Sequence, residues 1–221
     1  MKTVSITIDG RHITASEGQT LLWAALANGI FIPNLCAMED AGEPEASCRL
    51  CFVEVEGYAQ PVTACTEVVR EGMVVNTCGP RALRLARTAA ELLLASDPLD
   101  CGRCPANRAC ALQRIAVHLG LKLKSRRLRR LVRDLPVDAT SPVFVFDRSR
   151  CVLCGRCVWI CREREGVGAI GFARRGFRRV VTTFGDDPLA ASPCTGCGRC
   201  VVACPVGALA FKNRDVPAHV R

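Results

Sequence analysis

Two short runs near the start of the chain alternate apolar and polar residues. They cover residues 3–9 and 11–15, and the dipeptide Asp9-Gly10 lies between them. Alternation with a period of two is typical of a strand with one buried face, and Asp-Gly favours a tight two-residue turn. The pattern therefore predicts a β-hairpin.

Three segments with helical patterns follow. Residues 20–28 predict a short helix with Thr20 or Ser16 as its N-cap. Residues 80–95 predict a longer helix, which would span about 24 Å at the usual rise per residue. Residues 111–120 also have helical spacing. Strands and helices are both expected, which favours an α+β chain.

A strongly basic segment occupies residues 122–135. Its apolar residues recur at helical spacing, which predicts an amphipathic helix with a buried apolar face and an exposed basic face. We expect the basic face either to be solvated or to dock onto an acidic partner subunit. The basic residues are Lys122, Lys124, Arg126, Arg127, Arg129, Arg130 and Arg133, and the apolar residues are Leu128, Leu131, Val132 and Leu135.

Residues 166–171 match the glycine pattern GxGxxG of dinucleotide-binding loops. That pattern indicates a nucleotide site only between a strand and a helix. Here the next segment, 172–184, predicts a second β-hairpin instead. We therefore expect no nucleotide site at these glycines.

Composition directs attention to the cysteines. The 221 residues include 16 Cys but only 8 Phe, 2 Trp and 1 Tyr, so something besides aromatic packing must organise the interior. No apolar run suggests a signal peptide or a membrane span. In a reducing cytosol, cysteines at C-x2-C spacing are metal ligands before they are disulfides. The sequence predicts a cytoplasmic metalloprotein without a membrane span.

The formal charge of +9 allows a nucleic-acid-binding alternative. However, that value counts cysteines as neutral, and metal-bound cysteines are thiolates. Much of the positive charge would then balance anionic clusters. We therefore expect no nucleic-acid partner, and a cluster- or zinc-bearing nucleic-acid-binding protein remains the alternative from another class.

The first cysteine group has the spacing C-x11-C-x2-C-x13-C. Two of its members share a tight loop, and the others come from segments before and after it, which suits a [2Fe–2S] core beside a sheet. A single zinc ion bound by the same four residues is the alternative. The group consists of Cys36, Cys48, Cys51 and Cys65.

The C-terminal region carries C-x2-C-x2-C-x3-C twice. Three closely spaced cysteines can bind one face of a [4Fe–4S] cluster, and in two-cluster ferredoxins the fourth binds the other cluster. The spacing therefore predicts two crossed ligand sets. One is Cys151, Cys154, Cys157 and Cys204, and the other is Cys161, Cys194, Cys197 and Cys200.

A third group, between the other two, is incomplete. Cys101, Cys104 and Cys110 have the spacing C-x2-C-x5-C, with no fourth cysteine or histidine close by in the sequence. Both a [4Fe–4S] cluster and a zinc ion normally take four ligands. The sequence therefore poses the question of what completes this middle site.

The succession of motifs resembles one known assembly along nearly the whole chain. The first cysteine group is followed by PLDCGRCPANRACALQ, CVLCGRCVWIC, GVGAIGFARRGF and SPCTGCGRCVVACPVGAL. This order is similar to the electron-relay region of the large iron–sulfur subunit of complex I, which also begins many [FeFe]-hydrogenases and NAD-linked formate dehydrogenases. A free-standing form is the small diaphorase subunit of NAD-reducing hydrogenases.

The resemblance implies one [2Fe–2S] and three [4Fe–4S] clusters in three domains. These are a β-grasp [2Fe–2S] ferredoxin domain at 1–78, a small helical [4Fe–4S] domain at 79–138 and a two-cluster bacterial-type ferredoxin domain at 139–221. It implies electron relay between an NAD(P)H–flavin diaphorase subunit and a catalytic hydrogenase or formate dehydrogenase subunit. An electron-bifurcating or complex I-like oxidoreductase is the alternative setting.

The chain stops at Arg221, where longer relatives continue into a catalytic domain, so we expect a relay in a hetero-oligomer that is not catalytic alone.

The resemblance also suggests the missing fourth ligand. The family motif reads His-Pro-x-Asp-Cys, and in this chain the histidine position is Asp97, four residues before Cys101. We expect the Asp97 carboxylate to bind iron, with Asp100, His118 or solvent as the alternatives. The remaining cysteine, Cys78, is expected to bind no cluster, because the predicted helix 80–95 separates it from Cys101.

Overall fold

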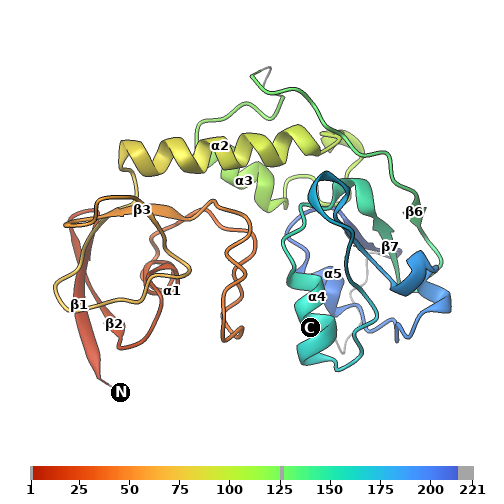
Figure 1. Ribbon diagram of the computed structural model, residues 1–221, viewed down its shortest axis with the longest axis horizontal. Helices are drawn as coiled ribbons and strands as arrows, with labels where there is room; N and C mark the ends of the chain where they lie inside the picture. The colour runs from red at the N-terminus through yellow and green to blue at the C-terminus, as the bar shows by residue number, and fades with distance from the viewer. Residues whose placement is uncertain (1, 125–126, 214–221) are drawn as a thin grey trace. The chain divides into compact units, whose positions relative to one another are not determined.

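The computed structural model describes residues 2–124 and 127–213, which form two compact units (Figure 1). The first unit holds the described residues up to Leu92 together with Ile115–Lys122, and the second holds Leu93–Arg114 and the described residues from Leu123 onward. Among the described residues, no helix has the length and apolar character needed to cross a membrane.

A five-stranded mixed sheet organises the first unit. Its order is β2-β1-β5-β3-β4, and β1 pairs in parallel with β5 while the other neighbours are antiparallel. The strands are β1 (Thr3–Ile8), β2 (Arg11–Ser16), β3 (Phe52–Val55), β4 (Val62–Thr63) and β5 (Val74–Asn76).

The predicted N-terminal hairpin is confirmed. Strands β1 and β2 pair from Thr3↔Ser16 to Ile8↔Arg11. The turn residues Asp9 (φ 51°) and Gly10 (φ 77°) both have positive φ, as a type I′ turn requires.

The short helix α1 (Leu21–Ala27) packs on this sheet, and its buried residues share a core with β1, β3 and β5. Thr20 occupies the N-cap position, but its side chain makes no capping bond. Instead, the amides of Leu21 and Leu22 donate to carbonyls of Glu67 and Ala64. A mixed sheet with a central parallel pair and one packed helix is the expected β-grasp arrangement.

Helices α2 (Pro80–Ser96) and α3 (Ala111–His118) confirm two further predictions. Proline suits the first position of α2, where its missing N–H removes no helical bond. Glu54 Oε1 accepts hydrogen bonds from the amides of Arg81 (2.8 Å) and Ala82 (3.1 Å). The Glu54 side chain of β3 thus accepts hydrogen bonds from backbone amides that have no partner within the first turn of α2.

The second unit contains two small sheets. Strands β6 (Val137–Asp138), β7 (Phe144–Asp147) and β10 (Leu209–Phe211) form an antiparallel sheet of order β10-β7-β6. Strands β8 (Gly171–Ala173) and β9 (Val180–Thr182) form the predicted second hairpin. The glycine-rich residues 166–171 lead into strand β8 rather than into a helix.

Two short helices begin inside the repeated cysteine motifs. They are α4 (Arg156–Trp159), which continues into a π-helical turn at Ile160–Arg164, and α5 (Arg199–Ala203). Each follows a left-handed glycine, Gly155 or Gly198. Single 3₁₀ turns occur at Cys101–Arg103, Arg148–Arg150, Gly176–Arg178, Phe184–Asp186 and Leu189–Ala191.

The predicted basic amphipathic helix is wrong for the described part of its segment; Arg126 lies outside the described residues. Residues 127–136 form no helix, and Leu131 and Val132 are 47% and 44% exposed rather than buried. The segment bonds instead to distant backbone: Leu131 N–H donates to Ala95 O, and the Arg130 guanidinium donates to Asp97 O and Pro98 O. The Leu131 bond uses a backbone N–H that a helix would need.

Candidate iron–sulfur cluster sites

The four cysteines of the first group are all buried in the first unit, where they form two thiol pairs. Cys36 Sγ and Cys48 Sγ lie 3.4 Å apart. Cys51, just before β3, pairs with Cys65, just after β4. Two pairs of thiols suit the two irons of a [2Fe–2S] core.

The electrostatics of these pairs fit a cationic centre. The hydrogen bond between Cys36 and Cys48 lowers the pKa of Cys36 to about 5, and the bond between Cys51 and Cys65 lowers the pKa of Cys65. The pKa of Cys48 is raised by its bond to Cys36 and by burial. In each pair, the thiol with the lowered pKa loses its proton readily and the thiol with the raised pKa keeps its proton. Removing both protons requires a nearby positive charge, which iron supplies.

The middle site lies in the second unit. Asp97 and the three cysteines of the incomplete motif line one cavity, together with Arg150 and Gly207. Cys101 begins a 3₁₀ turn, and the amide of Cys104 donates to the Cys101 carbonyl at 3.2 Å. Cys110 directly precedes α3; burial raises the pKa of its thiol, and the backbone amides of Gln113 and Leu112 lower it. The structure therefore brings together the residues that the sequence assigned to this site.

The conformation of Asp97 is fixed by the loop after α2. Its Oδ1 accepts a hydrogen bond from the Leu99 amide at 2.7 Å, and Leu99 has a positive φ of 54°. Burial raises the pKa of Asp97, while the Leu99 amide and Arg150 lower it. A carboxylate has a second oxygen, which provides a donor for iron.

The alternative ligands lie elsewhere. The Asp100 carboxylate accepts from Arg103 Nε at 2.8 Å, and neither Asp100 nor His118 lines the middle cavity. His118 packs edge-on against Phe31 in the first unit, with ring centroids 4.9 Å apart. Cys78 is exposed in the first unit beside Thr77. Among the predicted candidates, Asp97 is the carboxylate that lines this cavity.

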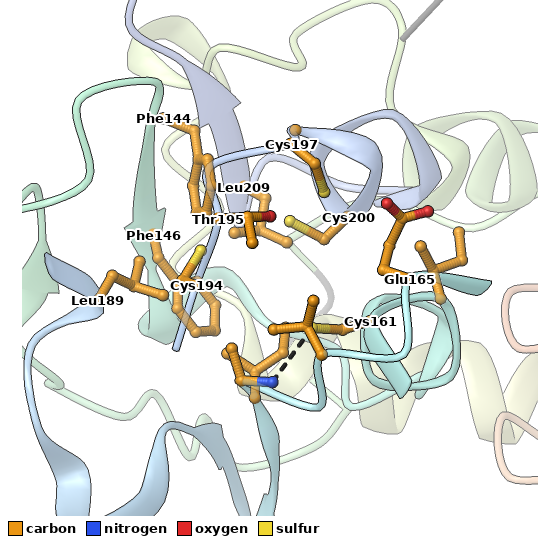
Figure 2. A pocket seen from close by; sticks show the side chains of 15 residues that line it. Phe144, Phe146, Cys161, Glu165, Leu189, Cys194, Thr195, Cys197, Cys200 and Leu209 are labelled. Atoms are coloured by element: carbon orange, nitrogen blue, oxygen red, sulfur yellow. Dashed lines mark hydrogen bonds between the residues drawn. The ribbon is translucent and has the colours of Figure 1, made fainter. Parts of the chain in front are cut away.

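The eight C-terminal cysteines group across the two repeats. Cys161 lies in the first repeat, yet it lines one pocket with Cys194, Cys197 and Cys200 of the second (Figure 2). The Ala169 amide donates to Cys161 Sγ at 3.3 Å. The amides of Val167 and Gly168 donate to the Cys161 carbonyl, so the glycine-rich segment wraps around this cysteine.

The complementary group joins three cysteines of the first repeat with the last cysteine of the second. Burial raises the pKa of Cys157 well above its ordinary value. The nearby thiols of Cys151, Cys154 and Cys204 add more to this rise than Cys200 of the other group does. The cysteines of the two repeats thus lie close to one another, and their division into two ligand sets stays a prediction.

Buried thiols in both groups fit iron. Burial raises the pKa of Cys151 to about 11 and that of Cys154 and Cys200 to about 12. A ligand thiolate at such a position needs a cation to stabilise it.

Within the described residues, the Arg156 Nε is buried without a hydrogen-bond partner, and its charge acts on Cys154 and Cys204. An anionic cluster between these side chains would balance that charge.

Across residues 2–124 and 127–213, no three His, Cys, Asp or Glu side chains are arranged to hold one metal ion. The ligands of an iron–sulfur cluster need not meet at one point, because each binds a different iron of the cluster.

The sequence patterns did not indicate two residues that line the middle site, Arg150 and Gly207. They come from the other cysteine motifs and meet the middle cysteines only in the folded chain.

Three family models match the chain in sequence order. A 2Fe-2S iron-sulfur cluster binding domain matches residues 1–79. The NADH-ubiquinone oxidoreductase-G iron-sulfur binding region matches 87–124. A 4Fe-4S binding domain matches 143–170 and 190–209. The chain therefore contains a [2Fe–2S] domain and [4Fe–4S] binding regions.

Curated relatives match over almost the whole chain. It is 38% identical to the NADPH-Fe(3+) oxidoreductase subunit alpha of Geobacter sulfurreducens, covering 97% of this chain and 25% of that protein. It is 36% identical to the NADP-reducing hydrogenase subunit HndD of Solidesulfovibrio fructosivorans, covering 95% of this chain and 36% of that protein. The chain thus spans about a quarter to a third of these relatives.

A solved structure matches over almost the full chain. A chain in the crystal structure of NAD+-reducing [NiFe]-hydrogenase in the H2-reduced state has a TM-score of 0.85 and 31% identity. The match covers 97% of this chain and 90% of that one. The chain therefore belongs to the family of iron–sulfur proteins that includes this hydrogenase chain and shares the NADH-ubiquinone oxidoreductase-G iron-sulfur binding region.

Proposed function

We propose that the chain is an electron-relay subunit with one [2Fe–2S] and three [4Fe–4S] clusters. The crossed grouping of the eight C-terminal cysteines carries this proposal, because that arrangement gives two sets of four ligands from a duplicated motif. Bound clusters would supply one-electron transfer, which requires no substrate pocket in this chain.

Four ligand sets follow from the proposal. Cys36, Cys48, Cys51 and Cys65 hold the [2Fe–2S] cluster, and Asp97, Cys101, Cys104 and Cys110 hold the middle [4Fe–4S] cluster. Cys151, Cys154, Cys157 and Cys204 hold the third, and Cys161, Cys194, Cys197 and Cys200 hold the fourth. The corresponding domains are 1–78, 79–138 and 139–221, in the order of the matched family models.

The chain's own residues position and insulate these sites. Backbone amides donate to cysteine sulfurs, as Ala169 does to Cys161 and Leu153 does to Cys151. Such bonds stabilise thiolate charge and influence reduction potential. Phe144, Phe146 and Leu209 line the pocket of the Cys161 group and limit the access of water (Figure 2).

The proposed partners are an NAD(P)H–flavin diaphorase subunit and a catalytic hydrogenase or formate dehydrogenase subunit, in a cytoplasmic hetero-oligomer. The matched relatives are named as subunits of NADP- and NAD-linked oxidoreductases, which supports this setting. A reducing compartment keeps cysteines as thiols, so those at metal-binding spacing remain able to bind iron.

Iron and acid-labile sulfide analysis tests the cluster count. Anaerobically purified protein should contain about 14 irons per chain, from one two-iron and three four-iron clusters. A colourless zinc protein would contradict the proposal. Identification of co-purifying subunits should then recover a flavin-binding protein, and its absence from an intact complex would exclude the diaphorase assignment.

Substitutions of Asp97 test the least usual ligand. Asp97→Ala should leave three thiolates and a labile iron, so that oxidation yields a [3Fe–4S] signal in EPR. Asp97→His should raise the potential of the middle cluster, because anionic oxygen stabilises the oxidised core more than neutral imidazole does. Asp100→Ala and Cys78→Ser serve as controls and should change neither property. An unshifted four-iron cluster in Asp97→Ala would refute the assignment.

A further inference from the structure

A half-buried arginine lines the middle site. Arg150 contributes to the same cavity as Asp97 and the three cysteines, and its side chain is only 14% exposed. Its Nε donates to Asp147 Oδ2 at 2.8 Å, which anchors the guanidinium from the side of β7. A guanidinium has five N–H donors, so other donors remain for the cavity.

The charges around the cavity make this arginine significant. Asp97 lies at the position where the family motif has histidine, a neutral ligand. The carboxylate therefore adds one negative charge to the site in a partly buried environment. Uncompensated buried charge is strongly unfavourable. Arg150 forms an ion pair with Asp147 and also acts electrostatically on Asp97 and Cys104. The Asp147 carboxylate acts on Asp97 as well, so Arg150 faces more than one negative charge. Arg130 also acts on Asp97, but its guanidinium is exposed and binds the Asp97 and Pro98 carbonyls.

We propose that Arg150 is a positioning residue whose half-buried positive charge, shared with Asp147, stabilises Asp97 and raises the reduction potential of the middle cluster. This inference rests on the proposed function and adds a determinant of potential to it. Reduction adds one electron from an external donor and makes or breaks no bond. The added negative charge therefore remains at the site, where Arg150 stabilises it.

Potentiometric titration with dithionite, followed by EPR of the middle cluster, tests the inference. Arg150→Gln should lower the midpoint potential and make reduction about tenfold less favourable, or ~59 mV for a one-electron couple. Arg150→Lys retains the charge and should keep most of the wild-type potential. The matched control is Arg103→Gln, in the cysteine loop itself, because the Arg103 side chain is 88% exposed and screened by water.

A double variant separates charge balance from packing. Asp97→His with Arg150→Gln removes one charge of each sign, so its potential should lie between those of the two single variants. This variant should also assemble the cluster even where Arg150→Gln alone does not. Failure of the double variant to assemble would overturn the inference.

The outcomes distinguish the inference from the proposed function. A wild-type protein without a middle-cluster signal would overturn the proposed function itself. A normal wild-type signal that Arg150→Gln leaves unshifted would overturn only the role of Arg150. An equal shift in Arg103→Gln or in Arg150→Lys would also overturn it, because the effect would then not depend on the half-buried positive charge of Arg150.

Discussion

The backbone comes very close to a predicted ligand at Gly207. A Cβ placed on Gly207 would lie 2.4 Å from Cys104 Sγ, whereas non-bonded carbon contacts are comfortable at about 3.5–4.0 Å. Gly207 has no positive φ, so the backbone itself tolerates alanine. The effect of Gly207→Ala should therefore come from the thiol, which must move by about 1 Å.

A displacement of this size is large for a metal ligand. Metal–thiolate bonds are about 2.3 Å long, and ligand distances hold to within about 0.2 Å. We expect Gly207→Ala to lose the middle cluster, or about four irons per chain. Without a cluster the Cys104 side chain can rotate away, so overpacking should cost no more than about 1–3 kcal/mol of folding free energy.

The assay compares Gly207→Ala with Gly102→Ala. Gly102 lies between Cys101 and Cys104, two predicted ligands of the same cluster, and it has no positive φ. Apart from its chain neighbours, no heavy atom lies within 4 Å of a Cβ placed on Gly102. Iron analysis and EPR of the reduced protein should show loss of one cluster in Gly207→Ala and full content in Gly102→Ala. Equal iron content and unshifted middle-cluster signals in both variants would refute the steric argument.

Two further predictions concern the first unit. Cys48→Ala should abolish the [2Fe–2S] EPR signal and spare the three [4Fe–4S] signals, because those ligands belong to the second unit; joint loss of all signals would contradict independent assembly. Glu54→Ala should remove the acceptor for the Arg81 and Ala82 amides, at about 1 kcal/mol. Hydrogen exchange at these amides should then quicken about fivefold, with the exposed Glu56→Ala as control, and unchanged exchange would argue against a capping role for Glu54.

Local patterns predicted local structure well. The N-terminal hairpin, α2 and the β8–β9 hairpin were predictable because period-two and helical spacing report directly on which residues face a core. The cysteine repeats similarly specified which thiols could meet. The family resemblance, rather than any periodicity, directed attention to Asp97.

The wrong prediction and the omissions share one physical cause. Residues 127–136 have helical apolar spacing, yet Arg133 donates to the carbonyls of Arg179 and Cys151, and Leu135 donates to Ser149 Oγ. Gly207 and Arg150 likewise act on partners far away in sequence. Contacts of this kind have no signature in a window of ten residues.

The two repeated cysteine loops keep one backbone conformation even where their residue types differ. Gly155 and Gly198 have φ of 81° and 76° at equivalent positions. At another equivalent pair, Gly196 has φ 69° and Leu153 has φ 56°. A left-handed leucine costs roughly 1 kcal/mol or more, yet the first loop retains this turn. In the same loop the Leu153 amide donates to Cys151 Sγ at 3.4 Å. The first repeat thus keeps the backbone conformation of the second, although leucine makes that conformation less favourable than glycine does.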